Sequence, residues 1–138
     1  MLTRPTVATI GIGVLLVSTL RCGGDESGPS ELSECAGPVT LSVSTGTAPR
    51  FTWTPVCRLF LVLVEDPSGD GDQWGVLSDS SNNVAPGVSY GVIPSGATKE
   101  LLAPVPLVAG HSYHATVARF TGPGHEDGII IGQRDFTP

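Results

Sequence analysis

The sequence has few positive charges, and these charges form no basic stripe. Its 138 residues include seven Lys and Arg against 13 Asp and Glu. A protein that binds nucleic acid needs clustered cations to displace the counterions of the phosphates, so this balance argues against a nucleic-acid partner. It equally argues against electrostatic docking on anionic lipid. The excess of acidic residues mainly favours solubility.

Common metal-site motifs are also missing. Neither Cys35 nor Cys57 belongs to a Cys-x-x-Cys pair, which argues against a zinc site. The only methionine is Met1, so the usual axial ligand of a blue-copper sandwich is absent from the rest of the chain. The acidic turn at residues 66–72 offers oxygen ligands to calcium, but its spacing misses the EF-hand pattern. We therefore expect no metal and no cofactor.

A nucleophilic hydrolase requires a nucleophile, a base and an orienting acid. The chain offers His111, His114 and His125, but no obvious strained turn that would expose a nucleophile. The first two lie three residues apart at the start of a predicted strand, so they should point to opposite faces. We interpret the histidines as surface or capping residues and expect no catalytic activity. A hydrolase that uses His111 or His125 with a nearby acid stays a distant alternative.

The start of the chain predicts export. Val7–Leu20 is an apolar run of 14 residues that follows Arg4, whereas a membrane-spanning helix needs roughly 20 residues. A short apolar helix behind a positive flank is typical of a signal peptide, here residues 1–21. The region resembles a bacterial lipoprotein signal, which implies lipid on Cys22, with Arg21 where that family has Gly or Ala. Two alternatives stay open: the signal peptide is cleaved without attachment of lipid, or it stays uncleaved and acts as a weak anchor.

A flexible tether is expected over residues 22–36, because this stretch is rich in Gly, Ser, Pro and acidic residues. Without Arg4 and Arg21, five cations and 13 acidic residues remain, which gives a net charge of 5 − 13 = −8. The rest of the chain, 37–138, is long enough for one domain. We expect the protein in the cell envelope, at the outer face or the periplasmic side of a bacterial membrane.

The cysteine count fits an oxidising compartment. If Cys22 carries lipid, Cys35 and Cys57 remain as an even pair, and a disulfide between them would persist outside the cytoplasm. Closing that loop would stabilise the fold by about 3 kcal/mol. Two unpaired buried thiols are the alternative.

Short apolar runs between Gly, Pro, Asp and Asn clusters predict an all-β domain. We find no capped helical periodicity after the signal and no internal repeat. Leu59–Val64 is apolar on both faces, which is typical of a strand covered on two sides. Residues 99–108 are expected to form an edge strand or an extended segment, because Pro104 and Pro106 cannot donate to a ladder. The other expected strands lie at 39–43, 51–53, 74–78, 88–93, 112–120 and 129–136.

Two patterns resemble fibronectin type III domains. Leu107-x-Ala-Gly110-x-x-Tyr113 is similar to the turn before their sixth strand, and Pro49-x-Phe-x-Trp53-x-Pro is similar to their second strand. The resemblance implies a single immunoglobulin-like antiparallel β-sandwich, with Trp53 in the core. It also implies a tyrosine corner, in which the Tyr113 hydroxyl bonds a backbone group upstream. In that family the chain enters the first strand near the loop after the second, which agrees with a bond between the two cysteines.

Three residues are candidate ligand contacts. Trp74 and Tyr90 are flat aromatic residues that would stack on a sugar ring or anchor a protein partner if exposed, and would otherwise pack in the core. His125 lies in a Gly-rich loop, which is either a recognition loop or an ordinary connector.

The sequence therefore predicts an exported, lipid-anchored envelope protein whose β-sandwich is a non-catalytic binding or structural module. Its partners would be the membrane, through the anchor, and an unidentified protein or glycan. A carbohydrate-binding module that uses Trp74 and Tyr90 is the main alternative.

Overall fold

Alternation of apolar and polar side chains gives strands in the computed structural model, which describes residues 31–69, 71–79, 81–121 and 127–138. The described strands are β1 Thr40–Val43, β2 Arg50–Thr54, β3 Leu61–Asp66, β4 Gly71–Leu77, β5 Val88–Ser89, β6 Lys99–Leu102, β7 Tyr113–Thr121 and β8 Asp127–Phe136. The all-β prediction is confirmed for this part of the chain. The expected signal peptide, Cys22 and His125 lie outside the described residues.

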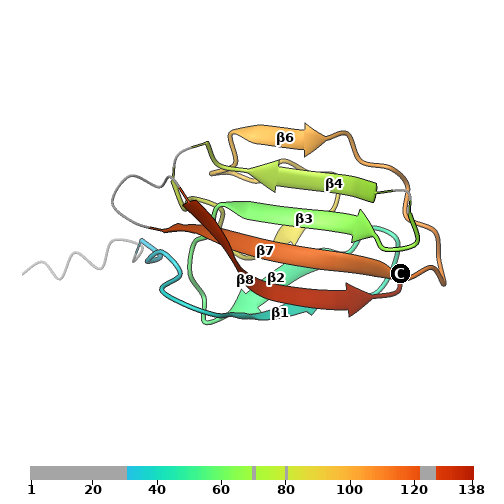
Figure 1. Ribbon diagram of the computed structural model, residues 1–138, viewed down its shortest axis with the longest axis horizontal. Helices are drawn as coiled ribbons and strands as arrows, with labels where there is room; N and C mark the ends of the chain where they lie inside the picture. The colour runs from blue at the N-terminus through green and yellow to red at the C-terminus, as the bar shows by residue number, and fades with distance from the viewer. Residues whose placement is uncertain (1–30, 70, 80, 122–126) are drawn as a thin grey trace, which may run out of the picture. The chain divides into compact units, whose positions relative to one another are not determined.

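The strands form two antiparallel sheets in a sandwich-like arrangement (Figure 1). One sheet has three strands in the order β1-β2-β5, and the other has five in the order β6-β4-β3-β7-β8. The short strand β6 pairs only with β4 and ends before Pro104, so the prediction of an edge strand there is confirmed.

The core lies between the two sheets. Phe51 on β2 and Trp74 on β4 are fully buried, and their ring centroids lie 6.4 Å apart across the interior. Trp53 is also buried, as expected, and its indole Nε1 donates a hydrogen bond of 2.8 Å to the backbone oxygen of Cys57. This bond satisfies the one polar group that the tryptophan brings into the core.

The predicted strand over 88–93 is too long. Only Val88 and Ser89 pair with β2, and the Val92 N–H then donates to the Ser89 oxygen at 3.1 Å, which closes a turn. Gly91 has a φ of 73°, a left-handed conformation that glycine adopts without strain. As a result, Val92 and Ile93 are exposed rather than paired.

The Cys35–Cys57 disulfide is confirmed, with the two Cα atoms 4.9 Å apart. Backbone hydrogen bonds join the same segments, because the Cys35 N–H donates to the Arg58 oxygen and the Arg58 N–H donates to the Ser33 oxygen. Residues 31–36, which the composition assigned to a tether, accordingly belong to the compact unit Glu31–Pro138. Composition alone could not show that a polar segment pairs with a loop far along the chain.

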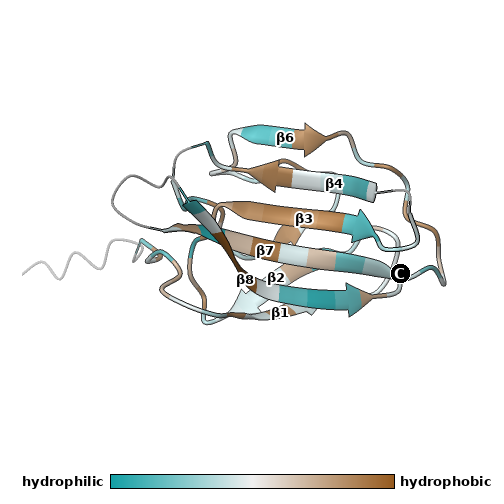
Figure 2. Cartoon of the chain, in the orientation of Figure 1, coloured by the Kyte–Doolittle hydropathy of each residue, from teal (hydrophilic) through white to brown (hydrophobic). Residues whose placement is uncertain are grey.

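Strand β3 is covered on one face only by the described residues. Val62 and Val64 point into the core and are fully buried, whereas Leu61 and Leu63 lie on the outer face and are partly exposed. Figure 2 shows this apolar strand in the middle of the five-stranded sheet. We expected cover on both faces, but Leu61 and Leu63 on the outer face stay partly exposed in the described part of the chain.

Candidate functional site

A turn with a buried tyrosine precedes β7. The Tyr113 side chain is buried, and its hydroxyl accepts a hydrogen bond of 3.0 Å from the backbone N–H of Val108. Gly110, with a φ of 81°, allows the tight turn between them, and Leu107 packs into the core at its base. This geometry is the contact that the tyrosine-corner pattern predicts.

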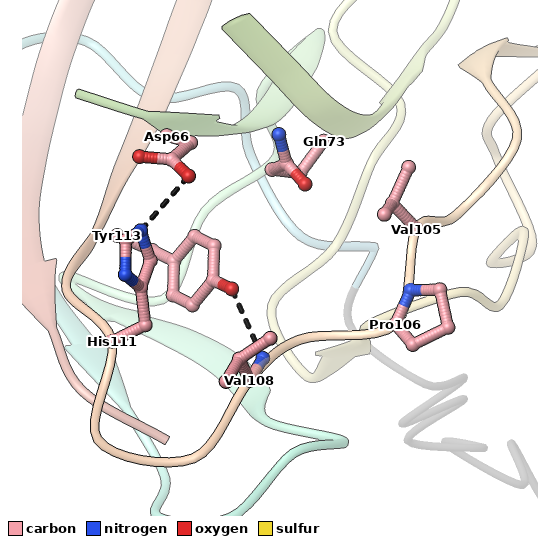
Figure 3. Close-up of a pocket in the computed structure, with 7 residues that line it drawn as sticks. All are labelled: Asp66, Gln73, Val105, Pro106, Val108, His111 and Tyr113. Carbon is pink, nitrogen blue, oxygen red and sulfur yellow. Dashed lines mark hydrogen bonds and ion pairs between the residues drawn. The ribbon is translucent and has the colours of Figure 1, made fainter. Parts of the chain in front are cut away.

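A small pocket of about 200 Å³ opens beside this turn (Figure 3). Its residues come from the end of β3, from β4, from the segment after β6 and from the turn before β7. Asp66, His111 and Tyr113 lie together on one side, and Val105 and Pro106 lie on the other (Figure 3). Gln73 and Val108 complete the lining.

Asp66 is the most constrained polar group of the pocket. One carboxylate oxygen accepts hydrogen bonds from the Ser68 hydroxyl at 2.6 Å and the Ser68 backbone N–H at 2.8 Å. The other lies 2.8 Å from His111 Nε2. The Ser68 hydroxyl, followed by the His111 contact, lowers the pKa of Asp66 to about 2. Because an ionised carboxylate only accepts hydrogen bonds, Nε2 is the protonated nitrogen of His111.

A second tyrosine ties the pocket wall to β4. The Tyr90 hydroxyl donates a hydrogen bond of 2.6 Å to the backbone oxygen of Val105 and lies 3.4 Å from the backbone oxygen of Gln73. The Gln73 backbone oxygen also accepts a hydrogen bond of 3.2 Å from the Val105 N–H. Burial raises the pKa of Tyr90 to about 12. The hydroxyl therefore keeps its proton at neutral pH, and the wall stays bound to the sheet.

Burial changes the roles expected of Trp74 and Tyr90. The side chain of Trp74 has no exposed surface, and Tyr90 is only 9% exposed. Trp74 packs on Tyr90 with ring centroids 5.2 Å apart, and its Nε1 donates to Glu100. Neither ring presents a face to a sugar, so both belong to the core. The buried faces of β4 and the turn after β5 could not be recognised before the strands were paired.

The other histidine in the described chain has a different setting. His114 on β7 lies 2.6 Å from Asp135 on β8 through Nδ1, and the Asp135 side chain is 79% exposed. This pair lies on the sheet surface and lines no pocket with His111. Within the described ranges, no group of three or more His, Cys, Asp or Glu side chains is arranged to hold a metal ion.

One motif was missed in the sequence. Residues 87–91 have the spacing Gly-x-Ser-x-Gly, which in hydrolases places the serine on a sharp strand-to-helix turn. Here Ser89 lies in the two-residue strand β5 and is followed by a turn rather than a helix. It also lies outside the lining of the pocket that holds Asp66 and His111. The motif therefore forms no nucleophile elbow.

Comparison with known proteins found no match: no family model, no curated protein and no solved structure matches the chain. In the part of the chain that the structure describes, no helix is long and apolar enough to cross a bilayer.

Proposed function

We propose that this chain is an exported envelope protein, tethered by lipid on Cys22, whose domain is a non-catalytic module that binds a protein partner at the pocket. The apolar run and Cys22 support the export and the tether. The disulfide supports an oxidising compartment.

The sheet order supports an immunoglobulin-like domain of the fibronectin type III kind. In such sandwiches the first, second and fifth strands belong to one sheet, and in the other the third strand pairs with the second to last strand, which pairs with the last. The orders β1-β2-β5 and β3-β7-β8 follow this plan. Strand β6 adds a further edge strand beyond β4.

The size of the pocket is the observation that carries the binding proposal. Pockets for drug-sized ligands occupy about 300–1,000 Å³, and this one has about 200 Å³. The volume suits one side chain rather than a whole ligand. Val105 and Val108 are 48% and 62% exposed at its rim, so a partner surface that inserts a side chain would also cover apolar area around it.

The polar groups of the pocket favour an uncharged partner side chain. The oxygens of Asp66 accept two hydrogen bonds from Ser68 and one from His111, which fill three of the roughly four acceptor positions of the carboxylate. The Tyr113 hydroxyl accepts from Val108 and keeps its own proton to donate. A side chain with an apolar stem and an acceptor oxygen fits this arrangement.

Binding is favoured over hydrolysis because the pocket lacks the hydroxyl or thiol of a usual catalytic triad. Among the described residues that line it there is no Ser, Thr or Cys. The Ser68 hydroxyl donates to Asp66, not to His111. His111 and Asp66 therefore do not form a triad with a serine or cysteine in this pocket.

The tether is tested by labelling cells that express the full chain with a radioactive fatty acid. We expect label on the wild type and none on Cys22→Ala. An unlabelled wild-type chain would contradict the tether.

Partner binding is tested by pull-down from envelope extracts with the full chain and two matched variants. Val108→Asp adds a charge at the pocket rim, and Val56→Asp adds one at a site that is similarly exposed, 57% against 62%. We expect the captured protein to be lost with Val108→Asp and kept with Val56→Asp. Equal capture by both variants, or no captured protein, would contradict the pocket as the binding site.

A further inference from the structure

The outer face of the five-stranded sheet carries an apolar row. The register aligns Leu61 of β3 with Leu77 of β4 on one side and with Ala118 of β7 on the other, and Ala118 in turn faces Ile130 of β8. Directly paired residues share a face. Because Val62 is buried in the core, these four neighbours lie on the face that points away from it.

The row continues toward the start of β3. The rings of Phe60 and Phe120 stack with centroids 3.9 Å apart. A Cβ on Gly128 would come within 3.0 Å of the Phe60 ring, so the β8 backbone lies directly on that ring. Ile129 and Ile130, which follow, are 43% and 59% exposed. We call the surface that Phe60, Leu61, Leu77, Phe120 and Ile130 form around the buried Ala118, which is 3% exposed, the apolar half-face.

The other half of the same face is polar. Glu65 of β3 pairs with His114 of β7, and His114 pairs with Asp135 of β8. Figure 2 shows the change along β3, from apolar at its start to hydrophilic at its end. The solvated face of an ordinary antiparallel sheet carries polar residues along its whole length. The apolar half-face is therefore a local departure from that pattern.

The first described residues of the chain are bonded to residues close to this surface. Ser33 and Cys35 are hydrogen-bonded to Arg58, which lies two residues before Phe60. Residues 22–30 separate the proposed lipid on Cys22 from the described domain, and nine residues span at most about 30 Å. A lipid at that position would keep the apolar half-face close to a bilayer at high effective concentration.

We propose that the apolar half-face lies on the bilayer that holds the lipid, an inference that rests on the proposed tether. Binding at the headgroup boundary grows with the apolar area buried there, and this contribution does not depend on basic residues, of which the acidic chain has few. The pocket lies at the other end of β3, with Asp66, so this orientation leaves it open to a partner.

The experiment uses the full chain, purified from a bacterium that processes it, in vesicles of phosphatidylethanolamine and phosphatidylcholine with a nitroxide-labelled lipid. A fluorophore is attached to Ile130→Cys or, as the matched control, to Val108→Cys; both positions are about 60% exposed, at 59% and 62%. We expect the nitroxide lipid to quench most of the fluorescence at 130 and to leave that at 108 unchanged.

Each other outcome contradicts a different statement. If the protein does not sediment with the vesicles, the tether fails, and the orientation fails with it. If it sediments but 130 and 108 are equally unquenched, the orientation alone is overturned. If the fluorophore at 130 is shielded before vesicles are added, a second copy or the N-terminal apolar run covers the half-face instead of lipid. Gel filtration and the mass of the purified chain separate those two occupants.

Discussion

At the end where the chain enters, the domain is held by a disulfide and a buried amide, whereas at the pocket end it is held by hydroxyl groups and a carboxylate. Asn82, 1% exposed, donates to Glu34 and accepts from the Phe120 N–H, so it joins the entering segment to β7. At the pocket, Tyr90 and Tyr113 bind the two ends of the segment Val105–Val108.

This difference indicates which end of the domain opens more easily. A covalent bond and a fully buried amide resist local opening, whereas single hydroxyl contacts contribute about 1 kcal/mol each. Regions that bind partners are usually drawn from the less stable parts of a domain. The comparison therefore agrees with a fixed entry end and a pocket end that adapts to a partner.

The largest loss of stability is expected from replacing a glycine near the entry end, and a glycine beside the pocket is its control. Gly96 and Gly110 both have positive φ, but a Cβ on Gly96 would lie 2.2 Å from the backbone oxygen of Asn83, whereas one on Gly110 would meet nothing within 4 Å. From left-handed strain and overpacking together, we expect Gly96→Ala to lower the free energy of unfolding by about 4 kcal/mol. Gly110→Ala adds only the left-handed strain and should lower the free energy of unfolding by about 1 kcal/mol. Urea denaturation measures both, and equal losses would contradict the close packing at the entry end.

The next effect concerns the disulfide. Replacing Cys35 and Cys57 together by Ala should lower the free energy of unfolding by about 3 kcal/mol, because the unfolded chain regains the freedom of the closed loop. Cys22→Ala serves as the control and should leave the unfolding curve unchanged. A double variant as stable as the wild type would show that the hydrogen bonds to Arg58 hold this end alone.

A smaller effect is expected at the tyrosine corner. Tyr113→Phe removes the acceptor of the Val108 N–H and should lower the free energy of unfolding by about 1 kcal/mol. Amide exchange of Val108 should become faster, while that of Cys35, bonded to Arg58 at the other end, should not change. If the Val108 amide exchanges as slowly in the variant, the hydroxyl does not hold the pocket wall.

The smallest effect is the pH dependence of Asp66. Its pKa of about 2 in the folded chain is below the ordinary value of 3.8. The ionised group thus stabilises the fold above pH 4, and this contribution is lost as the pH falls toward 2. Ser68→Ala removes the main cause of the shift and should raise the pKa of Asp66 toward its ordinary value, as followed by NMR of the carboxyl carbon. An unchanged midpoint in Ser68→Ala would assign the shift to His111 instead.

Local patterns were enough for the strands and for the tyrosine corner. Alternation located β1, β2 and β7, and in β1 and β2 the buried and exposed side chains alternate as expected. The cysteine pair followed from the even count that remains when Cys22 is set aside, and the core position of Trp53 followed from the resemblance to fibronectin type III domains. The strands and the tyrosine corner depend on residues close together in the chain, so local patterns are enough to predict them.

The pocket depends on contacts between distant segments and could not be predicted. Asp66 and His111 are 45 residues apart, and nothing in either segment indicates that they meet. For Trp74 and Tyr90 the sequence left open whether they are exposed or in the core, because only the pairing of β4 with β3 and β6 shows which side is buried. The apolar half-face was visible as the two-sided run Leu59–Val64, but its lack of cover appeared only with the register.

The division of tasks between the two ends is tested most directly by hydrogen exchange of the lipidated full chain, with and without vesicles. The account predicts slower exchange at residues 127–131 when vesicles are present, and unchanged exchange at residues 105–111 beside the pocket. Protection of the pocket segment by vesicles, or no protection at residues 127–131 in protein that sediments with them, would contradict it.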